Sequence, residues 1–183
     1  SRFWLHHSLN SLNKSLDQNL SIYSGDPIKV ILDIIDRLDI KEIFWNRCYE
    51  PWRINRDTHI KKELESKGIK VNTLNGSLLW EPWTIKKGDG TPYKDFTPYF
   101  RKGCLLSDEP RKPISTPINL DLFNDNNSLK DINALSLLPS TKWDIKMKSF
   151  WNIGELGANN RLTEFLNNGV ENYKVGRNIP SKP

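Results

Sequence analysis

The chain has 183 residues, of which 37% are apolar and 10% aromatic, a composition that favours a folded core over wholesale disorder. Its net charge of +5 suits an acidic partner such as nucleic acid without establishing one. No apolar run approaches the roughly 18 residues of a membrane-spanning helix, so we expect no membrane partner. The two cysteines, Cys48 and Cys104, lack metal-ligand spacing, and we expect no metal site and a reduced chain in the cytoplasm.

The chain starts at Ser1 and enters a helical pattern at once, which indicates a segment cut from a longer protein. Apolar residues recur every three or four positions, as on one face of an amphipathic helix: Leu5, Leu9, Leu12 and Leu16. His6 and His7 lie beside this stripe. Because adjacent residues cannot share one helix face, we expect a solvated or capping role for them rather than a metal pair. Alternating apolar and polar residues then predict a strand at residues 20–24.

Helices and strands alternate in the next segment. Asp26 suits a helix N-cap, and Pro27 suits the first helical position. The buried face of this helix is marked by an apolar stripe: Ile28, Ile31, Leu32, Ile35 and Leu38. We expect further strands at residues 42–46 and 69–73, joined by a helix over residues 51–68. Connections of this length give right-handed parallel crossovers, so we predict an α/β fold with a doubly wound parallel sheet, covered by helices on both faces.

The regular periodicity stops at Ser77. Prolines interrupt every candidate helix in residues 106–142, where we expect a long connector between domains. A last helix is expected after Gly154 and should end near Gly169. Three apolar residues would line one face of it: Leu162, Phe165 and Leu166. The tail from Tyr173 to Pro183 is expected to have no partner within this chain.

The segment from Ile43 to Asp57 is the first candidate for a ligand site. It begins as a buried apolar strand and turns polar at Asn46 and Arg47, just before a helix. Open α/β sheets bind ligands at the carboxyl ends of their strands, which favours this position. Glu50 is placed where a general base could act, but a carboxylate that stabilises the helix start is the favoured interpretation.

Three separated groups of residues give a more specific signal. The first group comprises Trp45, Asn46, Arg47, Tyr49, Glu50, Pro51, Arg56 and Asp57. The second comprises Tyr93, Lys94, Phe96, Thr97, Pro98, Tyr99 and Phe100. The third comprises Gly154, Glu155, Leu162, Phe165, Leu166, Gly169, Tyr173 and Arg177. In this order, with the long connector between the last two groups, the chain resembles the DNA photolyase/cryptochrome family over essentially its whole length.

The resemblance implies a Rossmann-like antenna domain, a linker and an all-α domain that binds FAD. We place the partial α/β domain at residues 1–105, the linker at residues 106–142 and the start of the helical FAD-binding domain at residues 143–183. The family's first two strands would precede Ser1, and they would separate the strand at 20–24 from the other two. The loop that binds the FAD phosphates would follow the last residue. By itself the chain is therefore expected to lack repair activity and to have negligible affinity for FAD.

The resemblance also assigns two site residues. In the family, the tyrosine matching Tyr173 contacts the flavin, and the arginine four residues later, Arg177 here, contacts DNA. Folate-binding members carry an Asn-Glu pair where this sequence has Trp52 and Arg53, which argues against a folate antenna. A flavin antenna, a deazaflavin antenna and no antenna at all stay open as alternatives. No catalytic residue and no metal ligand is assigned within the chain.

The function implied by the resemblance is light-dependent DNA repair by a monomeric lyase. The whole enzyme would split cyclobutane pyrimidine dimers in UV-damaged DNA by electron transfer from photoexcited reduced FAD. The alternative is a cryptochrome-type blue-light photoreceptor with the same fold and flavin but without repair activity. A third hypothesis, a nucleotide-binding α/β module unrelated to light, is disfavoured because the chain has no Gly-x-Gly-x-x-Gly or P-loop pattern.

Overall fold

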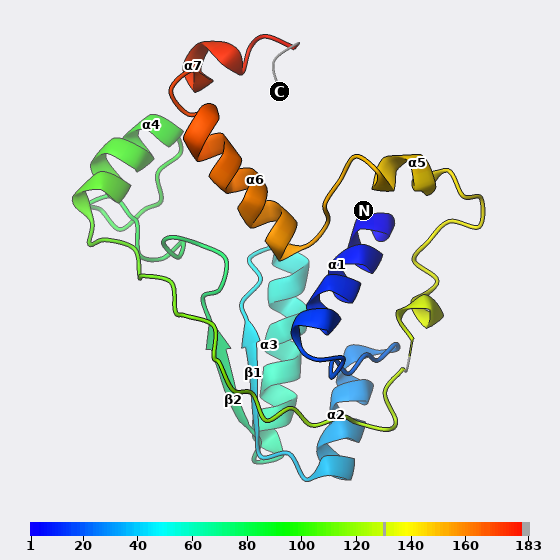
Figure 1. Ribbon diagram of the computed structural model, residues 1–183. Coiled ribbons are helices and arrows are strands. Elements are labelled where there is room, and N and C mark those ends of the chain that lie inside the picture. Colours follow the sequence, from blue (N-terminus) through cyan, green and yellow to red (C-terminus); the bar gives the residue numbers. More distant parts are fainter. Residues whose placement is uncertain (130, 181–183) are drawn as a thin grey trace. The chain divides into compact units, whose positions relative to one another are not determined.

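The computed structural model describes residues 1–129 and 131–180, which fall into two compact units (Figure 1). The sheet unit comprises Gly25–Ile118. The helical unit combines Ser1–Ser24 with the described residues from Asn119 onward. Each unit has its own contacts and is described by itself.

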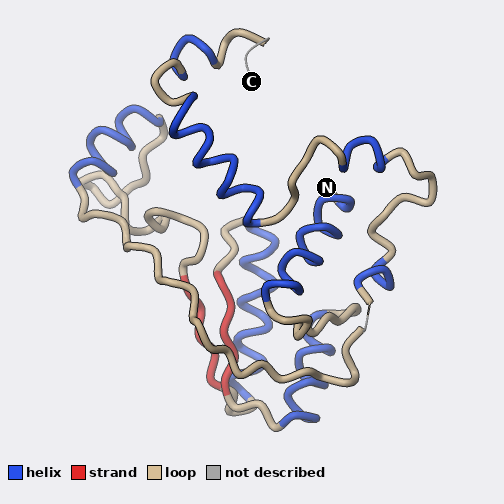
Figure 2. Tube along the Cα trace, in the orientation of Figure 1, coloured by secondary structure: helices blue, strands red, loops and turns tan. Residues whose placement is uncertain are grey.

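The sheet unit contains a parallel strand–helix–strand motif, with its two strands drawn in red in Figure 2. Its first elements are α2 (Pro27–Leu38), β1 (Glu42–Asn46), α3 (Pro51–Ser66) and β2 (Lys70–Leu74). The two strands pair in register from Glu42 opposite Lys70 to Asn46 opposite Leu74. The predicted parallel pairing is therefore confirmed, with the second strand one residue further along the chain than expected.

Local signals explain where the helices of this motif begin and end. The carboxylate of Asp26 accepts a hydrogen bond from the Lys29 backbone N–H at 3.1 Å, as expected for an N-cap. The chain leaves α2 through Asp39, which has a φ of 51°. It leaves α3 near Gly68, whose φ of 79° is a conformation that glycine adopts without strain.

The core of the sheet unit lies between α2, α3 and one face of the sheet. Its buried members are Ile35, Ile60, Leu64 and Ile69. Ile43 and Trp45 of β1 pack against this cluster together with Val71 of β2. Because successive strand residues point to opposite faces, Phe44 lies on the other face, where it is exposed. In the described sheet unit, both helices of the motif therefore pack on the same face of the sheet.

A second set of contacts in the sheet unit follows β2. The helical segment α4 (Phe96–Pro98), η1 (Tyr99–Gly103) and η2 (Cys104–Leu106) packs beside the buried side chain of Ile85. A Cβ atom added to Gly103 would lie 2.5 Å from Ile85 and 3.1 Å from Tyr93. Glycine is thus required for this close approach.

The helical unit has four α-helices and one 3₁₀ helix among its described residues. They are α1 (Arg2–Ser15), η3 (Ile132–Leu135), α5 (Asp144–Lys148), α6 (Glu155–Asn168) and α7 (Tyr173–Gly176). Of these, α1, α5, α6 and α7 are the four α-helices, and the predicted helices at both ends of the chain are confirmed. Between Leu106 and Asp144, the described residues form no helix except η3.

Three expectations about the helical unit are wrong. Residues 20–24 do not form a strand: they do not pair with β1, and the Ile22 carbonyl accepts one isolated bond from the Leu129 N–H at 2.8 Å, which is not a ladder. His6 is not solvated but only 6% exposed, because α1 buries Phe3 and His6 rather than the leucine stripe. The tail does have a partner, because the Tyr173 ring contacts Phe165. Residues 181–183 of the predicted tail lie outside the described part.

Candidate functional site

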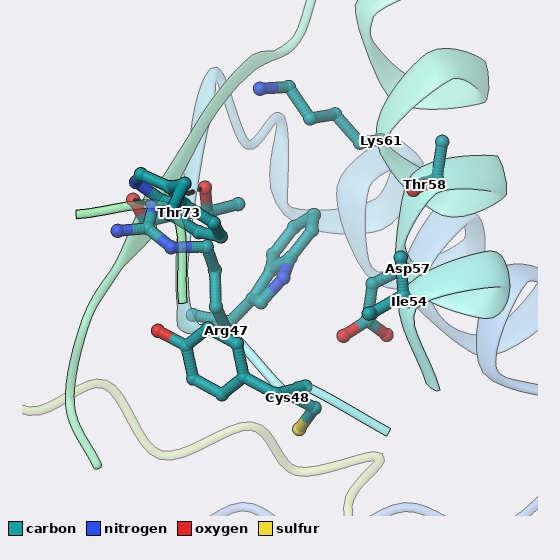
Figure 3. A pocket seen from close by; sticks show the side chains of 10 residues that line it. Arg47, Cys48, Ile54, Asp57, Thr58, Lys61 and Thr73 are labelled. Carbon is teal, nitrogen blue, oxygen red and sulfur yellow. Dashed lines mark hydrogen bonds between the residues drawn. The ribbon is translucent and has the colours of Figure 1, made fainter. Parts of the chain in front are cut away.

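The carboxyl ends of β1 and β2 border a pocket of about 190 Å³ (Figure 3). Parallel pairing brings these two ends to the same edge of the sheet, as expected for a ligand site. The pocket is lined by Trp45, Arg47, Cys48, Tyr49, Ile54, Asp57, Thr58, Lys61, Thr73 and Trp83. Figure 3 shows Asp57, Thr58 and Lys61 on α3, across the pocket from Arg47 and Thr73.

Arg47 is held at the end of the sheet by several hydrogen bonds. Its backbone N–H donates to the Leu74 carbonyl at 2.8 Å, which extends the ladder by one bond beyond β1. Its Nη1 donates to the carbonyl and the Oγ1 of Thr73, at 2.5 and 3.0 Å. Its Nε donates to Oε1 of Glu81 at 2.7 Å. The guanidinium is therefore fixed by the neighbouring strand and by the loop that follows it.

Glu81 joins Arg47 to Tyr49. The Tyr49 hydroxyl donates to the same carboxylate oxygen at 2.8 Å, so one oxygen accepts two hydrogen bonds. Burial by itself would raise the pKa of Glu81, but the hydrogen bonds from Arg47 and Tyr49 outweigh it and hold that pKa below its usual value. Burial and the hydrogen bond to Glu81 raise the pKa of Tyr49. Glu81 is thus an ionised anchor and not a carboxyl group tuned for proton transfer at neutral pH.

Aromatic rings form the walls of the pocket. The Trp83 ring lies 5.7 Å from the Arg47 guanidinium carbon and 6.2 Å from the Tyr49 ring. A neighbouring hollow of about 280 Å³ shares three lining residues with this pocket: Trp45, Cys48 and Asp57. Aromatic walls beside a fixed cation suit a planar conjugated ligand better than a reacting substrate.

The first turn of α3 carries the residues that the sequence had singled out near the pocket. Glu50 precedes the helix as its N-cap residue and lies 3.5 Å from Arg53 as an ion pair, which agrees with a carboxylate at a helix start. Trp52 is 60% exposed, and the guanidinium carbons of Arg53 and Arg56 lie 5.0 and 5.5 Å from its ring. Arg53 also donates to Sγ of Cys48 at 3.7 Å.

Tyr173 and Arg177 lie together at the end of the helical unit. Tyr173 begins α7, and Arg177 directly follows that helix. The Arg177 guanidinium carbon lies 5.6 Å from the Tyr173 ring, so both residues share one side, as their four-residue spacing predicted. The half-exposed Tyr173 ring also packs nearly perpendicular to the Phe165 ring of α6, with a centroid separation of 5.6 Å. An aromatic surface with an adjacent cation suits contact with a ring system and a phosphate.

Two residues at this edge of the sheet were missed in the sequence: Trp83, which lines the pocket, and Glu81, which holds the lining residue Arg47. Glu81 and Trp83 lie in the loop after β2, which the sequence marked only as a bulky apolar segment. A single carboxylate among apolar neighbours was the signal that could have found Glu81, because such a group needs a hydrogen-bonding partner when it is buried.

No three side chains of His, Cys, Asp or Glu within residues 1–129 and 131–180 are grouped so that they could hold a metal ion. No helix in this described part is long and apolar enough to cross a membrane.

Comparison with known proteins gives consistent matches along the chain. The family model for DNA photolyase matches residues 1–117. A deoxyribodipyrimidine photo-lyase of Agrobacterium fabrum is 33% identical, over 99% of this chain and 38% of that protein. Cryptochrome-1 of Arabidopsis thaliana is 27% identical, over 97% of this chain and 27% of that protein.

A solved structure matches the entire chain. The crystal structure of a bacterial class III photolyase from Agrobacterium tumefaciens superimposes with a TM-score of 0.91 and 32% sequence identity. The match covers 100% of this chain and 38% of that protein. The chain thus spans well under half the length of these relatives.

Proposed function

This chain belongs to the DNA photolyase family, and we propose that the protein carrying it is a light-dependent DNA repair enzyme. The observation that carries this proposal is the match over the whole chain, by sequence and by structure, to photolyases. Its substrate would be cyclobutane pyrimidine dimers in UV-damaged DNA. A cryptochrome-type photoreceptor is the second candidate, and the lower identity of 27% over a similar length makes it the weaker one.

We propose the following organisation for the whole protein. Residues 1–105 would belong to a Rossmann-like domain whose complete sheet is doubly wound, residues 106–142 to a linker, and residues 143–183 to the start of an all-α FAD-binding domain. Parallel pairing of β1 and β2 supports the first assignment, and the helices α5 to α7 support the last. The protein would act as a monomer in the cytoplasm.

Reduced FAD would supply the light-driven electron that splits the dimer, and the task of this chain is to position its partners. Tyr173 would contact the flavin. Its half-exposed ring, fixed by Phe165 on one side, fits that role. Arg177 would grip a DNA phosphate through its N–H donors, which holds the DNA in place without reading its sequence.

The pocket at the carboxyl ends of β1 and β2 would hold a second, antenna chromophore. Its aromatic walls of Trp45, Tyr49 and Trp83 and the fixed cation of Arg47 fit a planar conjugated molecule. Trp52 and Arg53 replace the Asn-Glu pair of folate-binding members and do not line this pocket. The replacement of that pair, by resemblance to the family, disfavours a folate antenna, and a flavin or a deazaflavin is proposed in its place.

The test is a repair assay on the complete protein. The purified protein should absorb blue light through bound flavin, and under that light it should remove cyclobutane dimers from DNA. The dark reaction is the matched control. Bound flavin without any light-dependent repair would favour the photoreceptor, and absence of flavin would contradict both candidates.

A further inference from the structure

Two adjacent histidines are packed inside the helical unit. Their rings contact each other and are largely shielded from solvent. His6 is 6% exposed, and its ring centroid lies 5.1 Å from that of His7, at an interplanar angle of 87°. The partly buried His7 ring also meets Phe3 edge-on at 4.7 Å. Among the described residues, Nδ1 of His6 and Nε2 of His7 are buried without a hydrogen-bond partner. Neither ring is therefore arranged to stabilise a charged imidazolium.

The hydrogen bond between His6 and Asn10 requires an unprotonated ring nitrogen. Nδ2 of Asn10 donates to the His6 carbonyl at 3.1 Å, which identifies this end of the amide as the NH₂ group. The same Nδ2 lies 3.0 Å from Nε2 of His6. Because Nδ2 can only donate, Nε2 must accept, and a proton on Nε2 would break this bond.

The charges around the pair come from both sides of the contact. On α1 there are the histidines themselves and Arg2, which donates to the Ser136 carbonyl at 2.5 Å. Facing them are Asp131, whose carboxylate caps η3, and Asp144 and Lys148 of α5. Burial lowers the pKa of His7, the charges of Lys148 and His6 lower it further, and Asp144 opposes them.

We propose that the His6–His7 pair makes the docking of α1 onto the segment from Asp131 to Trp151 sensitive to protons. With both rings neutral, the pair packs with Phe3, and Trp4 meets Trp151 edge-on at 5.5 Å. Protonation of His7 places a cation against the buried His6 ring and close to Lys148. The helix then loses the contacts that hold its N-terminal half.

The direction of the pH dependence follows from the lowered pKa of His7. The unfolded or undocked chain binds the proton more tightly than the docked chain does. The docked state therefore keeps its full stability above the ordinary histidine value, near pH 6.5, and loses stability as the pH falls below it. Each coupled proton should multiply the undocked fraction by up to about tenfold per pH unit in this range.

Hydrogen exchange measured by mass spectrometry on the whole chain tests the proposal. After correction for the intrinsic pH dependence of exchange, amides of residues 2–15 should exchange faster at pH 5.5 than at pH 6.5, by up to about fivefold for the one proton on His7. Amides of α3 should change little over the same range. An α1 whose corrected exchange is the same at both pH values would overturn the proposal.

Three variants identify the groups responsible. The double variant His6→Gln/His7→Phe keeps an acceptor for Asn10 and an aromatic ring beside Phe3, and it should lose most of the pH effect. His59→Gln, on the exposed surface of α3, is the matched control and should keep it. If the double variant does not fold, Lys148→Gln at an exposed position tests the proposal instead. Removal of the Lys148 charge should make the pH effect on α1 exchange smaller. A full effect in the double variant, or an undiminished effect in Lys148→Gln, would contradict the proposal.

Discussion

Single residues at the pocket are linked across long stretches of sequence. Arg47 reaches Thr73 on the neighbouring strand and Glu81 in the following loop, and Glu81 in turn accepts from Tyr49. The Glu81 side chain is 14% exposed and that of Arg47 is 30% exposed, so the pair is partly shielded from water. Removing either charge leaves the other without its partner, which is the costly case for a shielded ion pair.

We expect Glu81→Gln to lower the free energy of unfolding by about 1–2 kcal/mol at neutral pH, because two hydrogen bonds to a charged acceptor are weakened. Chemical denaturation of the wild type and the variant measures the difference. Glu109→Gln, at an exposed carboxylate of the same unit, serves as the control and should stay within about 0.5 kcal/mol of the wild type.

The same comparison has a defined pH dependence. The pKa of Glu81 is lowered in the folded chain. The contribution of its carboxylate to the free energy of unfolding is therefore fully present above the ordinary pKa of glutamate, and it disappears as the pH falls through the pKa of the folded state. The difference in free energy of unfolding between the wild type and Glu81→Gln should therefore be constant near neutral pH and should vanish below about pH 4.3. A gap that widens on acidification would show that the carboxylate is not the stabilising form.

The position of whole elements depends on the close approach of backbone and side chains as much as on the apolar area that they bury. The segment formed by α4, η1 and η2 lies against Ile85 through Gly103, whose missing side chain leaves room for that contact. Ile85 is buried, so it has little freedom to move away from an added methyl group. Packing, and not helix propensity, holds these short turns in place.

Gly103→Ala is expected to destabilise the chain by about 1–3 kcal/mol, because the new Cβ would overlap Ile85. Gly88→Ala is the matched control, since no atom lies within 4 Å of a Cβ added there. Thermal unfolding monitored by circular dichroism would compare the two. Equal melting temperatures for both variants would show that the segment relaxes without cost.

At the scale of the whole molecule, the net charge of +5 and the family membership both favour a nucleic-acid partner. Net charge alone gives only non-specific attraction, so the proposed function needs residues that hold DNA in a fixed position. Arg177 is the candidate for such a contact in this chain, because it lies beside Tyr173, the proposed flavin contact.

We expect Arg177→Ala in the complete protein to weaken binding to damaged DNA. The slope of log affinity against log salt should shrink by about one unit, as it does when one phosphate contact is lost. Flavin content and the light-driven step after binding should be nearly unchanged. Fluorescence anisotropy titrations at several salt concentrations measure the slope.

Arg161→Ala is the control for that experiment. Arg161 lies on α6 of the same helical unit and pairs with Glu164 at 2.7 Å, so its loss removes a charge without removing the proposed contact. If Arg177→Ala and Arg161→Ala have the same small effect, Arg177 is a surface residue and the proposed DNA contact is wrong. The repair assay would be unaffected by that outcome, so the two proposals fail separately.

The sequence by itself determined the elements whose signals are local. The cap at Asp26, Pro27 and the apolar stripe after it predicted α2, and Pro51 and Gly68 predicted the limits of α3 within two residues. The apolar run at residues 43–45 predicted β1. Each of these signals acts between residues a few positions apart, so it can be recognised without the rest of the fold. The family resemblance also came from motifs in the sequence, and the comparisons confirmed it.

Only the tertiary structure decided the features that depend on distant partners. Residues 20–24 have a strand-like pattern but no ladder, because a strand exists only where a neighbouring strand supplies hydrogen bonds. His6 is buried because η3, more than a hundred residues away along the chain, packs on α1. Glu81 meets Arg47 across 34 positions, which no local pattern indicates. Burial and pairing of this kind arise from the packing of separate elements, and their free energy appears only when those elements meet.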